Sequence, residues 1–393
     1  MTNNQSETDH SGPLGVQVAG LRLANPVLLA SFPESEGGRT LKSLAMEGKP
    51  GAVVTEPISQ DVPVYKSRGA ERVECVETQS AKAWITGEIP VAREGGVPVI
   101  VNLNLGMVSA DVWVDVAGTA EASGAAAIEL GWGGQAFGVP LLVGPDRSGC
   151  LITERIKKAV SFPLFVEIPY LYPLVLKDVV AALVDSGADG IITSGHIAGT
   201  RIDIESIMRS KGDPLHVGSI GGQTVKPVSL AMTQLVAANF SIPVVGSGGI
   251  RFGEDAIEYI MAGASAVQLV VDPEIKNLRL YQNLKNRVLA WMENHDVKSL
   301  NDIRGKALKM VGRENAEPYR ALVDAERCSA CGDCEVICAS VTYKSPDLPA
   351  SAIALPKEGG AAVVIEDRCV GCGWCKVVCH RDAITLDGYS SGL

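Results

Sequence analysis

Cys328-Ser-Ala-Cys331-Gly-Asp-Cys334-Glu-Val-Ile-Cys338 and its repeat, Cys369-Val-Gly-Cys372-Gly-Trp-Cys375-Lys-Val-Val-Cys379, decide the fold of the C-terminal part of this chain. Both runs have the spacing C-x2-C-x2-C-x3-C. Three closely spaced thiolates can hold one [4Fe-4S] cluster, while the fourth cysteine points away and ligates the other cluster of a pair. The doubled spacing therefore predicts a small α+β domain of the bacterial ferredoxin type with two [4Fe-4S] clusters.

The spacing also predicts which cysteines share a cluster. Zinc is one alternative, but zinc sites use paired C-x2-C ligands and would leave the threefold spacing unexplained. Disulfides are another, and they are not expected in a chain without a recognisable secretory signal. The first predicted ligand set is Cys328, Cys331, Cys334 and Cys379, and the second is Cys338, Cys369, Cys372 and Cys375.

The composition of the chain limits its class and its partners. With 393 residues, 46% of them hydrophobic, it can form one large domain and one small domain. It has no apolar run of about eighteen residues, so we expect no membrane span. The net charge of −10 argues against nucleic acid as a partner, because phosphates bind basic surfaces. Residues 1–14 are mostly polar and show no targeting pattern, so we expect a disordered tail and a cytoplasmic protein.

Short apolar segments recur along residues 15–296, and a glycine or asparagine turn and a stretch with helical periodicity follow them. Near-continuous apolar runs of this length are typical of buried parallel strands. Eight such units in a span near the usual ~250 residues predict an α/β fold, a (β/α)8 TIM barrel, with a doubly wound sheet as the alternative. The expected strands are Val27–Ala30, Ala52–Thr55, Val99–Leu103, Ala127–Leu130, Leu164–Ile168, Gly190–Thr193, Val244–Gly246 and Ala266–Val270.

The remaining segments complete the predicted organisation. Gly15–Leu23 predicts a hairpin that covers one end of the barrel, and residues 297–323 predict a charged linker before the ferredoxin domain, residues 324–393. The insert Ser340–Ala362 predicts a surface hairpin or loop. Segments with helical periodicity lie between the strands, and Ile275–His295 predicts the last helix of the barrel. Examples of the others are Asp111–Ser123, Cys150–Val160, Pro173–Ser186, Pro227–Ala238 and Gly253–Ala262.

The loops that follow the strands carry function in barrels of this kind. Three long connections, Glu56–Glu88, Gly131–Gly149 and Ser194–Val225, follow strands and so belong to one end of the barrel. Of two glycine stretches, 218–222 precedes the helix that starts near Pro227, and 246–250 follows the seventh strand. Bare backbone amides in front of helix N-termini bind anions, so these loops predict a phosphate site, with simple turns as the alternative.

Several of these segments resemble the dihydroorotate dehydrogenase family. They are residues 25–31, 51–55, 187–190, 218–227 and 242–250, and residues 15–390 as a whole are similar to the iron–sulfur subunits of bacterial NAD-dependent dihydropyrimidine dehydrogenases. The resemblance implies FMN at the barrel mouth. The residues that it implies for FMN binding are Ala30, Ser31 and Thr55 along the flavin ring, with Asn104 beside it, and Gly221, Gly222, Gly248 and Gly249 around the phosphate.

The substrate side departs from that family. Glu56 stands where the family has a lysine after the second strand, and Glu167 stands where it has a lysine beside the flavin. Replacing a positive by a negative charge at about 4 Å changes an interaction by several kcal/mol. Glu167 is then protonated, or the flavin is harder to reduce to its anion, or the ligand differs. No residue matches the family's proton-donating Cys or Ser. Dihydroorotate and dihydrouracil are therefore not expected as substrates.

Three residues are candidates for acid–base chemistry. His196 lies in a loop expected to face the ligand, and its alternative is an ordinary loop histidine. Glu56 and Glu167 end strands at the mouth, where titratable groups facing one cavity often take part in proton transfer. For these two, a structural salt bridge is the alternative.

These patterns together predict an FMN- and [4Fe-4S]-dependent oxidoreductase. The expected reaction is a two-electron step on a small, cyclic or conjugated substrate, with electrons passing through the clusters to or from a flavoprotein subunit or a soluble carrier. A homodimer or hetero-oligomer is expected from the family. In a second hypothesis the chain is an electron-transfer subunit whose barrel has lost its own substrate. In a third, the barrel binds another phosphorylated ligand and no flavin.

Overall fold

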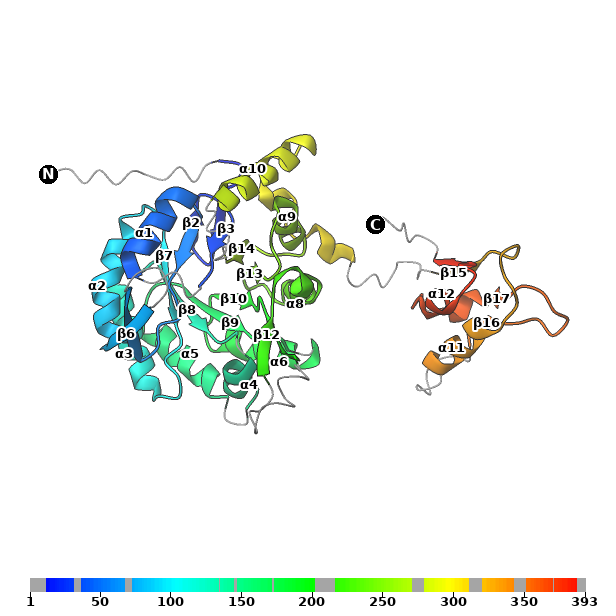
Figure 1. Ribbon diagram of the computed structural model, residues 1–393, viewed down its shortest axis with the longest axis horizontal. Helices are drawn as coiled ribbons and strands as arrows, with labels where there is room; N and C mark the ends of the chain where they lie inside the picture. The colour runs from blue at the N-terminus through cyan, green and yellow to red at the C-terminus, as the bar shows by residue number, and fades with distance from the viewer. Residues whose placement is uncertain are drawn as a thin grey trace. The chain divides into compact units, whose positions relative to one another are not determined.

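The computed structural model describes residues 12–31, 37–67, 73–133, 135–144, 147–171, 173–201, 216–270, 279–310, 320–342, 351–369 and 371–386. The chain divides into two compact units, residues 1–312 and 313–393 (Figure 1). Most of the predicted tail, residues 1–14, lies outside the described residues.

Eight parallel strands in the first unit close into a barrel, in the order β10-β13-β14-β3-β4-β7-β8-β9. The predicted barrel is therefore confirmed, and each strand agrees with its predicted range to within one residue at either end. Their residues are almost all buried, which explains why they form apolar runs in the sequence. The strands are β3 (Val27–Leu29), β4 (Ala52–Val54), β7 (Val99–Leu103), β8 (Ala127–Gly131), β9 (Leu164–Ile168), β10 (Gly190–Thr193), β13 (Val244–Ser247) and β14 (Ala266–Leu269).

Helices surround this closed sheet (Figure 1). Helices α1, α2 and α4 are not among the examples of helical periodicity given above; α1 begins with two glycines, and α2 and α4 each contain a proline, residues with low helix propensity. The start predicted for the last helix, residues 275–278, lies outside the described residues. The helices are α1 (Gly37–Gly48), α2 (Ala81–Arg93), α3 (Ala110–Ala122), α4 (Gln135–Val143), α5 (Ser148–Ala159), α6 (Pro173–Asp185), α8 (Lys226–Asn239), α9 (Gly253–Met261) and α10 (Arg279–Asn294).

The two ends of the barrel differ in what covers them. The hairpin of β1 (Val16–Val18) and β2 (Leu21–Leu23) sends Val18, Leu21 and Leu23 against inward-facing apolar side chains of the strands. The predicted long connections follow strands at the opposite end. They contain the hairpin β5 (Asp61–Ser67) with β6 (Val73–Ser80), helix α4, and the hairpin β11 (Ile197–Arg201) with β12 (His216–Ile220).

The segment predicted as a linker, residues 297–323, contributes to both units. Two short 3-10 helices, η2 (Leu300–Asp302) and η3 (Lys306–Met310), extend the first unit. Leu300 and Ile303 are buried there, and the Gly305 N–H donates to the Ile260 carbonyl at 3.0 Å. Ala321–Val323 forms strand β15 of the second unit. Residues 311–319, between them, lie outside the described residues.

The second unit repeats a small strand–helix pattern around its cysteines. β15 (Ala321–Val323) pairs with β18 (Ile384–Leu386), and β16 (Ile353–Ala354) pairs with β17 (Val363–Val364), both antiparallel. Of the insert predicted at residues 340–362, the first residues belong to α11 and β16 lies near the end, while β17 directly follows it. Helix α11 (Asp333–Thr342) contains Cys334 and Cys338 of the first cysteine run, and α12 (Trp374–Val378) contains Cys375 of the second. The core consists of Ala321, Ile353, Ala362 and Ile384 with Cys334 and Cys375. This is the expected α+β ferredoxin-like region.

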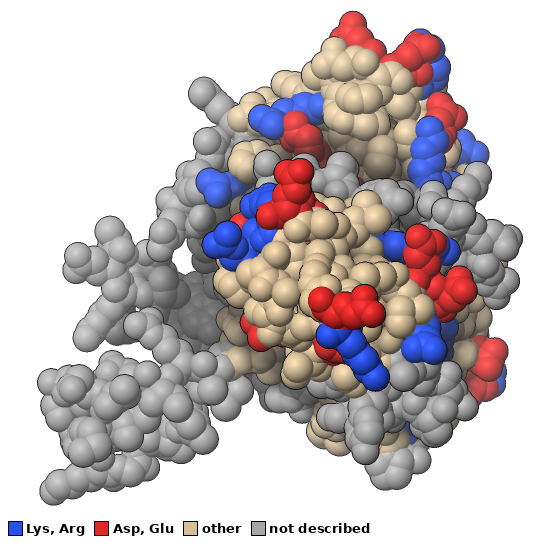
Figure 2. Space-filling model, turned by 90° about the vertical axis from the view of Figure 1, so that its right-hand side faces the viewer, with Lys and Arg blue, Asp and Glu red and all other residues tan. Residues whose placement is uncertain are grey.

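Acidic and basic side chains lie close together on the described surface that Figure 2 draws. Exposed pairs of this kind include Lys82 with Asp115 at 2.9 Å and Arg287 with Glu254 at 2.7 Å. Such pairs contribute little individually, because water screens both charges. Among the described residues, no helix combines the length and apolarity that crossing a membrane requires.

Candidate functional site

One large cavity opens at the carboxyl ends of the barrel strands. Its volume is about 890 Å³, within the range of small-molecule and cofactor sites. The loops after β3, β10, β12 and β13 and the inward side chains of β7, β8, β9 and β14 form its wall. The described residues that line it include Ala30, Ser31, Asn102, Asn104, Glu129, Gly131, Glu167, His196, Gly221, Gly222, Gly248, Gly249, Arg251 and Gln268.

Two glycine loops form one side of the cavity. Gly222, Gly248 and Gly249 have φ angles of +67°, +111° and +67°, a region that favours glycine. A Cβ on Gly249 would lie 2.9 Å from the Gly222 carbonyl oxygen, and one on Gly248 would lie 2.6 Å from Ser229 Oγ. The loops therefore pack directly against each other, with no side chains between their backbones and the cavity. This bare cradle, in front of α8 and α9, fits the phosphate of FMN.

An ion pair fixes the two helices behind these loops. Lys226, at the start of α8, contacts Asp255 of α9 at 2.6 Å and Glu258 at 2.8 Å. Asp255 also accepts the N–H groups of Arg251 and Phe252 at 2.8 and 2.7 Å. Burial alone would raise the pKa of Asp255, but Lys226 and these two N–H groups hold it below its usual value. The relative position of the two glycine loops is therefore set by a partly buried charge network.

A buried carboxyl lies at the strand side of the cavity. Glu129 of β8 is 2% exposed and accepts hydrogen bonds from Asn102 Nδ2 at 2.6 Å and from Gln268 Nε2 at 2.8 Å. Burial raises the pKa of Glu129 to about 7, although the two amide donors oppose the shift. Glu129 also borders the apolar interior of the barrel, which explains the weak solvation of its charged form.

A second carboxyl, Glu167 of β9, faces the same cavity. Burial and then the charge of Glu129 raise its pKa to about 8. The Gly133 N–H donates to this carboxyl at 3.3 Å. A Cβ on Gly133 would lie 2.2 Å from Glu167 Oε1, so a larger residue at position 133 would displace this carboxyl. Glu167 is therefore held neutral over much of the physiological pH range, next to a second weakly acidic carboxyl.

Two buried polar atoms at the cavity wall have no hydrogen-bond partner among the described residues. They are Asn102 Oδ1 and Ser31 Oγ, and both residues line the cavity. Buried oxygen atoms without partners are costly, and a bound polar ligand is the usual explanation at a cavity wall. The cavity therefore offers a phosphate cradle on one side and unsatisfied polar groups on the other.

The other sequence candidates lie in different surroundings. His196 lines the cavity, and burial lowers the pKa of its imidazole, which is therefore neutral near pH 7. Ser194 Oγ fixes its backbone by donating to the His196 carbonyl at 2.8 Å. Thr55 and Glu56 are not among the described lining residues. Thr55 is fully buried, where its hydroxyl accepts the Asn102 N–H at 3.0 Å and supports the strand ends.

Sequence reasoning did not select Glu129 and Gln268 as site residues. Each interrupts an otherwise apolar strand, in Ala127-Ile-Glu-Leu130 and in Ala266-Val-Gln-Leu269. A lone polar residue in the middle of a buried strand was the available signal, because such a residue needs a partner or a function. The structure brings these two side chains together with Asn102, Glu167 and His196 around one cavity.

The cysteines of the second unit line two further cavities. One contains Cys338, Cys369, Cys372 and Cys375, and the other contains Cys328, Cys331, Cys334 and Cys379. These are the two sets that the spacing predicts. Each cavity has four thiol groups and a mainly apolar wall, a donor set that fits an iron–sulfur cluster.

Two of the cysteine sulfurs accept backbone hydrogen bonds. The Ala352 N–H donates to Cys338 Sγ at 3.2 Å, and the Ala383 N–H donates to Cys379 Sγ at 3.3 Å. Both acceptors are the fourth cysteine of a run, so the same kind of hydrogen bond occurs in both halves of the unit. Hydrogen bonds to ligand sulfurs stabilise the negative charge of a reduced cluster and raise its potential.

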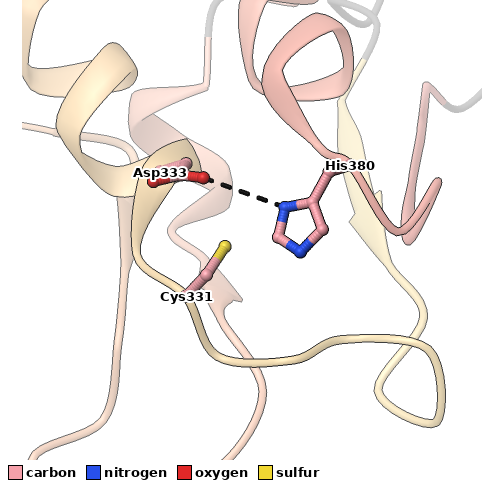
Figure 3. A group of neighbouring side chains, drawn as sticks. All are labelled: Cys331, Asp333 and His380. Carbon is pink, nitrogen blue, oxygen red and sulfur yellow. Dashed lines mark ion pairs between the residues drawn. The ribbon is translucent and has the colours of Figure 1, made fainter.

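A histidine and an aspartate lie beside one of these cysteines. His380 Nδ1 is 3.9 Å from Asp333 Oδ2, and Cys331 lies next to both (Figure 3). All three side chains are exposed. Since Cys331 already belongs to one set of four cysteines, this group is better explained as the border of that cluster site than as a separate metal site.

Models of known protein families match parts of both units. Residues 147–292 match the family model for dihydroorotate dehydrogenase, and residues 362–385 match the model for a 4Fe-4S binding domain. The first match contains Glu167, His196 and both glycine loops. The second contains only the second cysteine run.

Individual relatives match most of the chain. The catalytic subunit of dihydroorotate dehydrogenase B (NAD(+)) from Bacillus pumilus is 30% identical over 273 residues, which cover 65% of this chain and 84% of that protein. The subunit of the same name from Thermoplasma acidophilum is 28% identical, covering 75% of this chain and 99% of that protein. That from Methanocaldococcus jannaschii is 27% identical, covering 75% and 98%. About a quarter of this chain therefore lies outside each of the last two alignments.

Proposed function

The chain belongs to the dihydroorotate dehydrogenase family and is an FMN- and iron–sulfur-dependent oxidoreductase, and we propose a two-electron step at its barrel mouth on a small cyclic or conjugated substrate. Two [4Fe-4S] clusters pass the electrons to or from a partner protein, which is a flavoprotein subunit or a soluble carrier. The supporting observation is that one cavity combines a bare phosphate cradle with buried carboxyl and amide groups, in a chain with two four-cysteine sites.

Bound FMN supplies both hydride transfer and one-electron exchange, the two chemistries that link such a substrate to iron–sulfur clusters. The protein residues bind the cofactor and shield the cavity from water. The loops at Gly221, Gly222, Gly248 and Gly249 bind the phosphate with backbone N–H groups. The barrel wall excludes bulk water from the other side of the cavity, so charges there interact strongly.

Glu167 and His196 are the proposed proton-handling groups. The raised pKa of Glu167 keeps a proton on its carboxyl near neutral pH, so it can donate that proton to an atom in the cavity. The lowered pKa of His196 leaves a neutral imidazole that can accept one. Glu56 has no place in this proposal, because it does not line the described cavity.

The substrate that we propose is not dihydroorotate, although the relatives carry that name. Dihydroorotate bears a carboxylate, and the described lining residues place two carboxyls, Glu129 and Glu167, on the strand side of the cavity. Glu167 stands where that family has a lysine, so the described residues on the strand side offer the carboxylate of dihydroorotate no cation.

The second function is an electron-transfer subunit with a barrel that has no substrate of its own. It predicts a cavity filled by side chains beside Glu167 and His196. The cavity of about 890 Å³ that both residues line favours the enzyme instead. The names of the relatives, which are catalytic subunits, make an oligomer with a partner subunit the proposed assembly. Free thiols and clusters suit a reducing compartment, so we propose a cytoplasmic location.

Anaerobic purification followed by measurement of flavin, iron and sulfide tests this function. One FMN and about eight iron atoms per chain are expected. The loaded protein should then be reduced by a substrate candidate, with the flavin and cluster absorbance followed separately. About eight iron atoms without flavin would contradict the proposal. About four iron atoms would contradict the two-cluster relay.

A further inference from the structure

We propose that Glu129 and Glu167 border the polar edge of the flavin ring as neutral acids, so that two-electron reduction of bound FMN takes up two protons and leaves no anion. This inference rests on the oxidoreductase function above, because it concerns the cofactor of that function. It gives Glu167 the role of passing the second proton to the ring.

The two sides of the cavity suit the two ends of FMN. The glycine loops present bare backbone to a phosphate, whereas the opposite wall presents polar side chains. Ser31 Oγ and Asn102 Oδ1 are buried in that wall without a hydrogen-bond partner among the described residues. The pyrimidine edge of a flavin carries carbonyl oxygens, ring nitrogens and an N–H group, which are the partners that such atoms require.

The two carboxyls enter the cavity from neighbouring strands. β8 and β9 pair in parallel with Gly131 beside Glu167, and Glu129 precedes Gly131 by two residues, so both glutamates face the barrel interior. Hydrogen bonds from Asn102 and Gln268 hold Glu129 in place, at 2.6 and 2.8 Å. Two acids that interact in a weakly solvated site oppose each other's ionisation. A proton therefore stays on this pair at a pH where ordinary carboxyls are charged.

Positive charge lies elsewhere among the described lining residues. Arg251 is their only lysine or arginine; it directly follows the glycine loop 246–250, and its guanidinium carbon lies 5.4 Å from the centre of the Phe252 ring. His196 is the remaining titratable lining residue, and burial lowers the pKa of its imidazole, which is neutral near pH 7. A negative charge on the flavin ring would therefore have no cation beside it on the strand side.

This environment favours uptake of the second proton. Two-electron reduction places one proton at N5 of a flavin, and the second proton either binds N1 or stays in water and leaves an anion there. Burial and the charge of Glu129 raise the pKa of Glu167 to about 8, so this carboxyl carries a proton near neutral pH. Glu167 can pass its proton to N1 and regain one from water. The two electrons come from the substrate or from the clusters of the proposed function.

The pH dependence of the flavin reduction potential counts these protons. Each proton that accompanies two electrons changes the equilibrium constant of reduction about tenfold per pH unit, or about 30 mV. We would titrate the FMN-loaded full-length protein anaerobically with dithionite and redox dyes between about pH 6 and pH 7, where a hundredfold change, or about 60 mV, is expected. The near-ultraviolet absorbance of the fully reduced protein, which differs between neutral and anionic reduced flavin, is the second readout.

Two variants locate the effect at Glu167. Glu167→Gln exchanges a neutral acid for a neutral amide, so the equilibrium constant at about pH 6 should change less than about threefold. Glu167→Lys adds a cation that stabilises an anion at N1, so its equilibrium constant should change only about tenfold per pH unit. Glu293→Gln, at an exposed position of α10, is the matched control and should follow the unaltered protein. Flavin content is measured for each protein.

The outcomes separate this inference from the function on which it rests. A change of only about tenfold per pH unit in the unaltered protein, or an anionic reduced spectrum, overturns the inference alone. A change above about tenfold in Glu167→Gln at about pH 6 also overturns it, because the native carboxyl would then be charged. If Glu167→Lys purifies without FMN, these two measurements decide; if it holds FMN and keeps the hundredfold dependence, Glu167 does not border the ring. A chain that purifies with clusters and no FMN overturns the proposed function, and this inference with it.

Discussion

Replacing Glu167 by glutamine should make the barrel less sensitive to alkaline pH. The folded protein raises the pKa of this carboxyl from 4.5 to about 8, so the folded state holds a proton that the unfolded chain releases. The contribution of Glu167 to stability is therefore complete below about pH 4.5 and is lost as the pH rises through about 8. Glutamine has nearly the same shape, can still accept the Gly133 N–H and does not titrate.

The expected size follows from the same pKa values. Each pH unit between 4.5 and about 8 removes about 1.4 kcal/mol from the free energy of unfolding. Between about pH 6 and pH 9 the loss comes to about 2.5 kcal/mol. For a unit of this size, that corresponds to a fall of about 5 °C in the Tm of the barrel. Glu129 is present in both proteins, so its own titration largely cancels in the comparison.

Thermal unfolding at several pH values measures this difference. Unaltered protein should lose about 5 °C more than Glu167→Gln between about pH 6 and pH 9. The control is Glu293→Gln, an exposed carboxyl on α10, which should follow the unaltered protein. Parallel curves for the unaltered protein and Glu167→Gln would refute the reasoning, because they would show that Glu167 titrates as an ordinary surface carboxyl.

Three further substitutions test the other parts of the structure. Gly248→Ala should weaken FMN binding at least about tenfold, because the residue has a φ of +111° and its Cβ would meet Ser229 Oγ at 2.6 Å. Gly118→Ala, at an open position of α3, is the control, and equal flavin content in both variants would contradict a phosphate site at the glycine loops. Cys375→Ser should reduce the iron content from about eight to about four atoms per chain. Cys150→Ser, outside both cysteine cavities, should leave the iron content unchanged, and equal losses in both variants would argue against the assigned ligand set. Asp255→Asn should destabilise the barrel by about 3 kcal/mol in urea unfolding, since it breaks a largely buried ion pair, and a change under about 1 kcal/mol would show that this ion pair does not hold α8 and α9 together.

The sequence alone does not separate the two acidic candidates at strand ends, and their surroundings in the structure differ. Glu56 and Glu167 both lie at strand ends, so the sequence treats them alike. In the structure Glu167 points into the cavity from β9, while Glu56 follows the buried Thr55 and is absent from the described lining. The direction of a side chain just beyond a strand end depends on the backbone of the loop, and residue spacing does not report it.

The sequence by itself determined the features that depend on local spacing. The cysteine runs predicted the two groups of four cysteines that line separate cavities, the apolar runs predicted the eight buried strands, and the glycine loops predicted bare backbone before helices. Each of these signals lies within a few residues of chain, where covalent geometry and periodicity fix which side chains share a face.

Only the tertiary structure decided which polar groups meet inside the barrel. Glu129 and Gln268 are 139 residues apart, and their hydrogen bond exists because closure of the sheet brings β8 and β14 to a common interior. The raised pKa of Glu167 has the same origin, since it requires burial and the nearby charge of Glu129 from the neighbouring strand. Proximity and desolvation of this kind arise from packing between distant segments, and for that reason the linear order of residues did not reveal them.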